Sequence, residues 1–459
     1  METQNPTKFT ILMYPWLAHA HISSFLQLAK KLSANNFHIY FCSTPINILS
    51  IRKQLQGTPN YSSSIKILEI HLPSSPDFPP HFHTTKNAPL NLRSKLYRGF
   101  QMSMDGFSGI LSSVKPDLLL YDVLQHWAVK LASSMGIPAV HFSTTGAASN
   151  SFFFHFSIKK LEYHSRLFPY PGMYLRGHEW KSLSVDASHV ANDTSREDYG
   201  GDFAESKDIC LIKSCRAIEG KYIDYLSVLF QKKVLPVGQL VTRSGDEEND
   251  AEIMEWLSDK VQFSTLFISF GSENSLSKHQ MEETAKGLEL CDVNFLWVVR
   301  SPVGETMKME EEMPEGFLRR TRERGMIVQR WVPQDKILAH KSVGAFMSHC
   351  GMSSTLETAC FGVPVIALPL KLDQYLNARL LVEAGVAAEA EKDENGNWRR
   401  EAIADAIKRV FSEKKGEKSM RFAAAELSEK MEREDEDAIM AEAAEQLRRI
   451  CLKHKQNGT

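Results

Sequence analysis

A histidine, a glycine and two serines stand close together in residues 348–362, which read SHCGMSSTLETACFG. The apolar residues before His349 are expected to end a strand, and the residues from Ser354 onward to form a helix. The N-terminus of a helix exposes N–H groups and the positive end of its dipole, which suit a phosphate group. His349, Ser353 and Ser354 could donate hydrogen bonds to the same anion. The run is therefore a candidate phosphate site.

Glu357 leaves a second interpretation of this run open. Ser354 and Glu357 have the spacing of a capping box, in which a serine and a glutamate bond to N–H groups of the first helical turn. In that case the glutamate only caps its own helix. The local pattern does not decide between a cap and a ligand-binding role.

The elements that must position these residues alternate along both halves of the chain. Short apolar runs rich in β-branched and aromatic residues are followed by apolar residues at three- and four-residue spacing, as in 23–33 and 91–114. This alternation predicts βαβ units and buried parallel sheets, in which ligands bind just beyond the carboxyl ends of the strands. The expected strands are 9–14, 38–43, 66–71, 117–122, 139–143 and 209–214 in the first half, and 264–270, 294–300, 326–331, 344–348, 364–369 and 386–391 in the second.

The alternation restarts after residues 234–252, which pass a proline and two glycines and then become acidic, as a domain linker would. The expected fold is α/β, with two facing Rossmann-like doubly wound domains. The expected limits are an N-terminal domain at 1–238, a linker at 239–250, a second domain at 251–435 and a C-terminal helix at 436–459 that packs back on the N-terminal domain. The acidic run at 432–437, including Asp435 and Asp437, is expected on a solvated helix face and not at a metal site.

Composition excludes several classes of protein. The 459 residues are 43% hydrophobic with a formal net charge of −2, which predicts a large core and gives no sign of nucleic-acid binding. The seven cysteines are scattered without CxxC spacing, so reduced thiols in a cytoplasmic protein are expected. We expect neither a signal peptide nor a membrane span of about 20 apolar residues. The absence of GxGxxG after a strand and of GxxxxGK[ST] argues against dinucleotide enzymes and P-loop NTPases.

Residues 331–374 resemble the 44-residue signature box of the plant UDP-dependent glycosyltransferases of family 1. The resemblance is ungapped and extends over nearly the whole chain, from PWLAHAHISSFLQLAKKL near the start through SFGSE at 269–273. It implies a fold of the GT-B type and transfer of a sugar from a UDP-sugar to a small molecule. The matching positions of the box are Trp331, Pro333, Gln334, His349, Cys350, Gly351, Ser354, Glu357, Gly362, Val363, Pro364, Pro369, Asp373 and Gln374.

The resemblance also implies roles for individual residues of a donor site. Trp331 would stack on the uracil, with Val332 and Gln334 near the edge of the base. Glu357 would accept hydrogen bonds from both ribose hydroxyls. The diphosphate would be held by His349, Ser272 and the stretch Gly351, Met352, Ser353 and Ser354, and the sugar hydroxyls by Asp373 and Gln374.

Members of this family carry a catalytic base just before their first helix, and that position matches His21. Asp122, which could otherwise be a simple helix cap, would orient the imidazole and stabilise the imidazolium that forms. The acceptor hydroxyl would lose its proton to His21 while it attacks the anomeric carbon, so that an α-linked donor gives a β-glycoside without a metal ion. His19, Thr144 and Phe152 are expected at the acceptor.

Further resemblances bear on the substrates. Gln374 favours UDP-glucose, and the stretch KLDQYLNARLLVEAGV resembles members that extend an existing sugar of flavonoid or terpenoid glycosides. We therefore expect glucose transfer to a sugar hydroxyl of such a glycoside. Direct glucosylation of an aglycone, or a catalytically weak protein that binds UDP-sugars or small ligands, are the alternatives.

The remaining expectations concern partners and one unusual residue. A monomer is expected that binds UDP-glucose as co-substrate and a small acceptor, with no cofactor and no nucleic acid. Relatives have tryptophan at the position of Met352 and usually asparagine at that of Ser353. Because methionine is thinner and more flexible, we expect weaker UDP-glucose affinity and a broader range of UDP-sugars; if neighbouring residues fill the gap, nothing changes.

Overall fold

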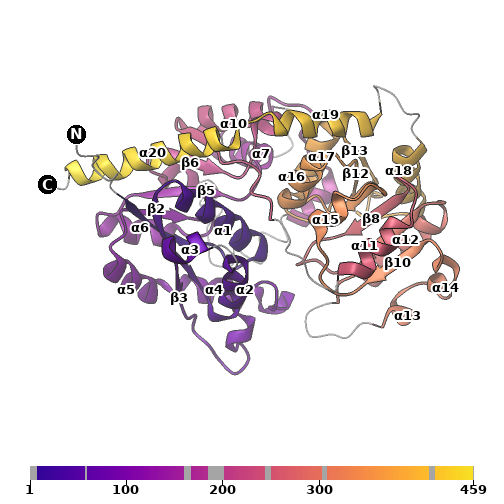
Figure 1. The fold of residues 1–459 in the computed structure, drawn as a ribbon, viewed down its shortest axis with the longest axis horizontal. Helices are drawn as coiled ribbons and strands as arrows, with labels where there is room; N and C mark the ends of the chain where they lie inside the picture. Colours follow the sequence, from indigo (N-terminus) through magenta and orange to yellow (C-terminus); the bar gives the residue numbers. More distant parts are fainter. Residues whose placement is uncertain are drawn as a thin grey trace. The chain divides into compact units, whose positions relative to one another are not determined.

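The computed structural model describes residues 8–56, 59–159, 167–183, 201–242, 250–301, 308–412 and 419–457. The chain divides into two compact units, the first made of 1–165, 189–240 and 434–459 and the second of 166–188 and 241–433 (Figure 1). Residues 167–183, expected in the N-terminal domain, thus cluster with the second unit. The central part of the expected linker, 243–249, lies outside the described residues.

The first unit is built on a seven-stranded sheet in the order β3-β2-β1-β4-β5-β6-β7, with all pairs parallel. Its strands are β1 (Phe9–Tyr14), β2 (Phe37–Ser43), β3 (Ile65–Glu69), β4 (Leu118–Tyr121), β5 (Ala139–Ser143), β6 (Ile209–Ile212) and β7 (Lys233–Pro236). Its helices are α1 (His19–Ala34), α2 (Pro45–Leu55), α3 (Pro59–Ser64), α4 (Arg93–Gln101), α5 (Met104–Val114), α6 (His126–Ser134), α7 (Ala147–Lys159), α9 (Gly201–Glu205), α10 (Arg216–Phe230) and α20 (Glu436–Asn457), with short 3₁₀ turns η1 (Pro80–Phe82) and η2 (Leu90–Leu92).

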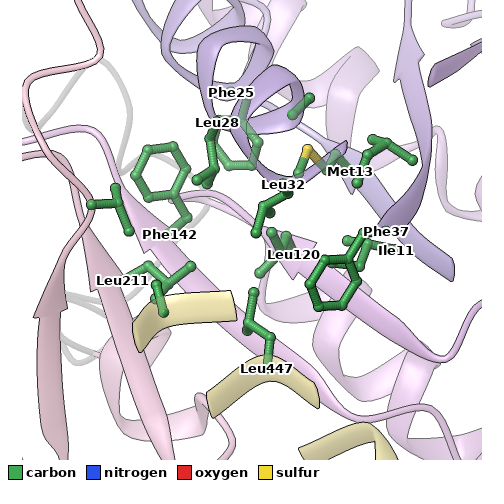
Figure 2. Close-up of a cluster of buried hydrophobic side chains, with 14 of the residues drawn as sticks. Ile11, Met13, Phe25, Leu28, Leu32, Phe37, Leu120, Phe142, Leu211 and Leu447 are labelled. Carbon is green, nitrogen blue, oxygen red and sulfur yellow. The ribbon is translucent and has the colours of Figure 1, made fainter. Parts of the chain in front are cut away.

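Both faces of this sheet are buried, which explains the continuous apolar runs of its strands. In β1, Ile11 and Met13 belong to one hydrophobic cluster, whereas Leu12 and Tyr14 belong to another. Figure 2 shows the first cluster between α1, the sheet and α20. The expected single helix at 91–114 is instead two helices, α4 and α5. They separate at Ser103, whose buried hydroxyl donates to the Phe100 carbonyl.

The last helix, α20, completes the core of the first unit (Figure 1). It begins at Glu436, after α19 has ended at Glu432, so the acidic run at 432–437 is not one solvated helix face. Glu434 lies in the break and accepts hydrogen bonds from the first N–H groups of α10. The buried residues of α20 recur at helical spacing, as expected for one apolar face, and are Met440, Ala443, Ala444, Leu447, Ile450 and Cys451.

The second unit has a six-stranded parallel sheet in the order β10-β9-β8-β11-β12-β13. None of the helices in the described part of the chain has both the length and the hydropathy that a bilayer crossing needs. The strands are β8 (Thr265–Ser269), β9 (Asn294–Val298), β10 (Gly325–Val328), β11 (Val343–Ser348), β12 (Val365–Ala367) and β13 (Ala387–Glu389). The helices are α11 (Ala251–Ser258), α12 (Lys278–Glu289), α13 (Met309–Glu312), α14 (Phe317–Thr321), α15 (Gln334–Leu338), α16 (Met352–Cys360), α17 (Gln374–Glu383), α18 (Arg400–Ser412) and α19 (Met420–Glu432).

Each sheet reverses its strand order at one place, between β1 and β4 in the first unit and between β8 and β11 in the second. Tyr14 pairs with Tyr121 across the first reversal, and Ser269 pairs with Ser348 across the second. The loops that follow these strands therefore emerge side by side. In doubly wound sheets such a reversal opens the crevice in which ligands bind.

Candidate active site

His21 and Asp122 meet at the reversal point of the first sheet. His21 lies in the first turn of α1, which begins at His19, so it is inside the helix and not before it as expected. Asp122 directly follows β4. The Nδ1 atom of His21 is 2.8 Å from Oδ2 of Asp122, and the His21 side chain is 21% exposed whereas that of Asp122 is fully buried.

Backbone N–H groups hold the Asp122 carboxylate in place. Oδ2 also accepts from the N–H of Trp16 at 2.9 Å, and Oδ1 accepts from the N–H of Val123 at 2.8 Å. The N–H of Asp122 donates to Oε1 of Gln125, whose amide in turn donates to the carbonyl of Tyr14. These contacts join the ends of β1 and β4, so the carboxylate has little freedom to turn away from His21.

The contact determines the tautomer of His21. An ionised carboxylate only accepts hydrogen bonds, so Nδ1 must carry the proton that faces Asp122. The neutral ring then has its lone pair on Nε2, which is the nitrogen able to accept a proton from a substrate. A buried carboxylate beside the ring stabilises the imidazolium that such a transfer creates. The arrangement is that of a general base with an orienting acid.

The three residues expected at the acceptor lie in different surroundings. Thr144, which follows β5, has its Oγ1 3.0 Å from Nδ1 of His21, so it is a second acceptor beside the same N–H. Phe152 is buried in α7, where its ring packs edge-on against Phe156 with centroids 5.0 Å apart. His19 is the first residue of α1 and is partly exposed. Their contact with an acceptor stays a prediction.

The candidate phosphate site lies at the reversal point of the second sheet. The helix α16 begins at Met352, and its N-cap is Gly351, which provides no side-chain cap. Ser354 is therefore the third residue of the helix, and the capping-box interpretation of Ser354 and Glu357 is wrong. The cause is the turn before the helix, where Cys350 adopts a φ of 61° and Gly351 is extended. N–H groups of an uncapped first turn are suited to bind an anion.

His349 is held against this turn by two glycines. A Cβ atom on Gly271 would lie 2.8 Å from Cε1 of His349, and one on Gly351 would lie 2.6 Å from its Nε2. Burial, and then the charge of Lys371, lower the pKa of His349 to about 4. The ring is therefore neutral at pH 7. Its Nδ1 is buried and has no hydrogen-bond partner in the described part of the chain.

Glu357 lies in the second turn of α16 and Trp331 follows β10, and these are the residues expected at the ribose and the uracil. Nε2 of Gln334 donates to Oε2 of Glu357 at 2.5 Å, which orients the carboxylate from a neighbouring helix. Trp331 is 51% exposed, and the guanidinium of Arg300 lies 5.2 Å from the centroid of its ring. An exposed indole supported on one face is a suitable stacking platform for a base. The side chain of Val332 is buried in the core, so it could contact a ligand only through its backbone.

Two family models together match residues 7–434. The model described as "Glycosyltransferase, N-terminal domain" matches residues 7–241, and that described as "UDP-glucoronosyl and UDP-glucosyl transferase" matches residues 234–434. The protein belongs to the plant family 1 UDP-dependent glycosyltransferases. It is thus a UDP-glycosyltransferase, and its two parallel-sheet units are those of the GT-B fold.

Individual relatives agree with this assignment. The chain is 46% identical over 444 residues to a mogroside IIIx synthase of Siraitia grosvenorii, covering 95% of this chain and 92% of that protein. It is 45% identical over 411 residues to a beta-D-glucosyl crocetin beta-1,6-glucosyltransferase of Gardenia jasminoides, covering 88% and 91%. The crystal structure of UGT73P12 of Glycyrrhiza uralensis superposes with a TM-score of 0.83 at 22% identity, covering 98% of both chains, which shows a shared fold.

The glycosyltransferase has a loop at 370–374 that carries Asp373 and Gln374. Oε1 of Gln374 accepts from the N–H groups of Leu370 and Lys371 at 3.0 and 3.1 Å, so the amide N–H₂ is the end of Gln374 that a ligand could use. Oδ2 of Asp373 accepts from Nδ2 of Asn377, which also donates to the carbonyl of Cys350. Asn377 thereby ties this loop to the turn that holds His349. Ser272, which follows β8, is partly exposed.

Sequence reasoning missed three residues of these sites. Gln125 joins the strands beneath Asp122, Arg300 supports Trp331, and Asn377 links the loop at 370–374 to the phosphate turn. A weak signal existed for Asn377, which lies four residues after Asp373 on one helix face. For the other two, no local pattern indicated a role: Gln125 lies just beyond one expected strand, and Arg300 is the last residue of another.

Proposed function

We propose that this glycosyltransferase transfers glucose from UDP-glucose to a sugar hydroxyl of a flavonoid or terpenoid glycoside, and so extends a sugar chain through a β linkage. The proposal rests on the relative from Gardenia jasminoides, which is 45% identical to this chain over 411 residues. The name of that enzyme says that it acts on an acceptor that already bears glucose. The His21–Asp122 pair supports it, because a sugar hydroxyl is weakly acidic and needs a base.

The donor is assigned to the second unit. Uracil stacks on Trp331, the ribose hydroxyls donate to Glu357, and Gln374 donates from its amide to the sugar. The diphosphate meets the N-terminus of α16, where His349 contributes as a neutral donor because its pKa is about 4. The dipole and the N–H groups stabilise the charge that grows on departing UDP, so we propose that no metal ion is required. The other residues assigned to the donor are Val332, Gln334, Ser272, Gly351, Met352, Ser353, Ser354 and Asp373.

The base is assigned to the first unit. The acceptor oxygen attacks the anomeric carbon from the side opposite the diphosphate while Nε2 of His21 takes its proton. The bond from the anomeric carbon to the phosphate oxygen breaks, its electron pair leaves with UDP, and the configuration inverts. Asp122 keeps Nδ1 protonated throughout and stabilises the positive ring, which later releases its extra proton to solvent. His19, Thr144 and Phe152 are assigned to the acceptor.

The cellular setting forms part of the same proposal. All seven cysteines are free thiols, as in proteins of a reducing compartment. We therefore place the enzyme in the cytoplasm. As a separate part of the proposal, it acts as a monomer.

The test uses the purified full chain with UDP-glucose, a panel of aglycones and their monoglucosides, and mass spectrometry of the products. Glucose added to the sugar of a monoglucoside supports the proposal, and a chelator should leave the rate unchanged. Glucose found only on aglycone hydroxyls would show direct glucosylation instead. UDP-glucose binding without transfer to any member of the panel would indicate a weak or inactive relative.

A further inference from the structure

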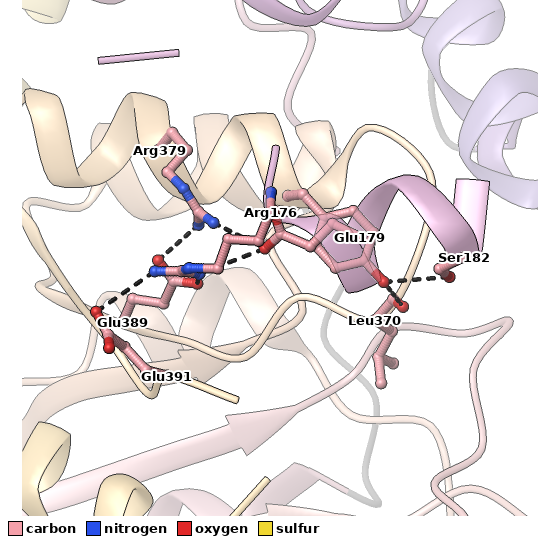
Figure 3. A network of polar contacts seen from close by, with 8 residues as sticks. Arg176, Glu179, Ser182, Leu370, Arg379, Glu389 and Glu391 are labelled. Atoms are coloured by element: carbon pink, nitrogen blue, oxygen red, sulfur yellow. Dashed lines mark hydrogen bonds and ion pairs between the residues drawn. The ribbon is translucent and has the colours of Figure 1, made fainter. Parts of the chain in front are cut away.

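A segment from the first half of the sequence is built into the second unit. Residues 177–183 are helical and pack against α17 and β13 through the polar network of Figure 3. The side chains that make this contact are Arg176, Glu179 and Ser182. One of the residues they meet, Tyr375, directly follows the loop at 370–374, to which the proposed function assigns the donor sugar.

The main contact is a nearly buried group of charges. Nη2 of Arg379 lies 2.7 Å from Oε1 of Glu179, and their side chains are 2% and 1% exposed. Nη1 of Arg379 lies 2.6 Å from Glu389 in β13, which also pairs with Arg176 at 2.7 Å. Loss of one partner in such a group leaves an uncompensated buried charge. The segment is therefore held in one definite position on α17.

Tyr375 connects the segment to the loop. It precedes Arg379 by one helical turn, so both side chains lie on the same face of α17. Its hydroxyl is within hydrogen-bond distance of the Leu370 carbonyl and lies 3.3 Å from Oγ of Ser182. Tyr375 is the donor in both contacts, so the single proton of its hydroxyl is shared between the Leu370 carbonyl and Oγ of Ser182. The phenol ring itself is buried.

The loop at 370–374 needs such support. Leu372 has a φ of 54°, in the left-handed region that residues with a side chain rarely adopt. The loop is closed at Leu370 by the carbonyl contact of Tyr375 and by the N–H contact of Gln374. Asp373 and Gln374 follow immediately. A small change at Leu370 would move both side chains.

We propose that residues 176–182 position the loop at 370–374 for the donor sugar, with Ser182 acting through Tyr375 and Glu179 through Arg379. The inference rests on the proposed function, which places the sugar at Asp373 and Gln374. Residues 176–182 precede the signature box of the family in the sequence. In this proposal they nevertheless influence how residues of that box bind the sugar. The nucleotide contacts at Trp331 and Glu357 lie outside this network.

The test compares the dissociation constants of UDP and UDP-glucose by calorimetry, because their ratio isolates the sugar. Tyr375→Phe removes one hydroxyl and is expected to weaken UDP-glucose binding by about fivefold with UDP binding unchanged. Ser182→Ala should have the same effect in a smaller amount. Glu179→Gln should weaken UDP-glucose binding to a similar extent and should also lower the melting temperature. The matched control is Tyr14→Phe, which removes another buried tyrosine hydroxyl, 3.2 Å from Ser103, in the first unit.

The outcomes separate the inference from the function on which it rests. If Tyr14→Phe lowers the melting temperature but leaves the dissociation constant of UDP-glucose unchanged, a loss of stability alone does not change sugar binding. The inference is overturned if Tyr375→Phe and Ser182→Ala leave the ratio of the two dissociation constants unchanged, whether neither constant changes or both change by the same factor. A wild-type chain that binds UDP and UDP-glucose equally would instead refute the assigned sugar site, and the inference with it.

Discussion

The imidazole of His349 packs directly on the backbone of Gly271, so closely that a methyl group at position 271 would lie 2.8 Å from its Cε1. The two residues follow β8 and β11, the neighbouring strands at which the second sheet reverses its order. Gly351 limits the ring on another side. The position of the proposed phosphate donor is thus determined by residues that have no side chain.

Gly271→Ala is expected to weaken UDP-glucose binding by at least about tenfold, because the methyl group must displace His349 and because Gly271 has a φ of 80°. Calorimetry measures the binding. Gly109→Ala is the matched control, since nothing lies within 4 Å of a Cβ at that helical position. Unchanged affinity in Gly271→Ala would show that the place of His349 does not matter to the donor.

His21→Ala should abolish transfer while UDP affinity survives, because the base contacts the acceptor and not the nucleotide. Asp122→Asn should reduce kcat by on the order of 10⁴-fold, as when the aspartate of a catalytic triad is changed in this way. Product formation and UDP binding are measured on the same preparations. If His21→Ala retained more than about a tenth of the wild-type rate, a different group would have to be the base.

Glu357→Ala is expected to raise the KM for UDP-glucose strongly, since one carboxylate serves two ribose hydroxyls. Because α16 has Gly351 as its N-cap, this change should not cost the roughly 1 kcal/mol that loss of a capping residue does. Donor kinetics and the melting temperature separate the two effects. A lower melting temperature with an unchanged KM would contradict the ribose assignment.

Met352→Trp should tighten UDP-glucose binding and narrow the range of UDP-sugars. The side chain of Met352 is only 5% exposed, so the larger ring must displace its neighbours, and a loss of about 1–3 kcal/mol in stability is expected. KM values for several UDP-sugars test the first part and thermal unfolding the second. Met352→Leu preserves the volume and serves as the control. Identical donor kinetics in Met352→Trp would refute the idea.

The free energy of unfolding should decrease as the pH is lowered from about 6.5 to about 4, because of His349. Burial lowers its pKa in the folded chain from 6.5 to about 4, so within this range the unfolded chain binds the proton more strongly. The stabilising effect is complete above pH 6.5 and is lost on acidification, at on the order of 1 kcal/mol per pH unit. Denaturant unfolding of wild type and His349→Asn measures the difference. Parallel pH profiles of the two proteins would contradict the low pKa.

The sequence was a good guide to the strands and to the places where chemistry occurs. Both faces of each sheet are buried, so strands such as β1 read as unbroken apolar runs. His349 directly follows an expected strand, where parallel sheets bind their ligands, whereas the role of Asp122 was implied by the resemblance to the family. Helix starts were less predictable. The N-caps of α1 and α16 are Ala18 and Gly351, and neither has the side-chain oxygen that usually marks a helix start.

The placement of residues 167–183 could not be predicted. Glu179 and Arg379 are 200 residues apart, and no local pattern near Glu179 indicates its partner. The same holds for Tyr375 and Ser182. Contacts of this kind depend on tertiary packing, whereas hydrophobic periodicity and helix caps report only local structure.

The return of α20 to the first unit has a consequence for recombination between relatives. The two ends of the chain build one core, in which Leu447 shares a hydrophobic cluster with Phe37 and Leu120. A chimera with one crossover near residue 240 would combine the sheet of one parent with the last helix of the other, and would inherit every mismatch between them. An exchange that keeps each compact unit intact replaces residues 166–188 and 241–433 together. Both ends of the chain then come from the same parent.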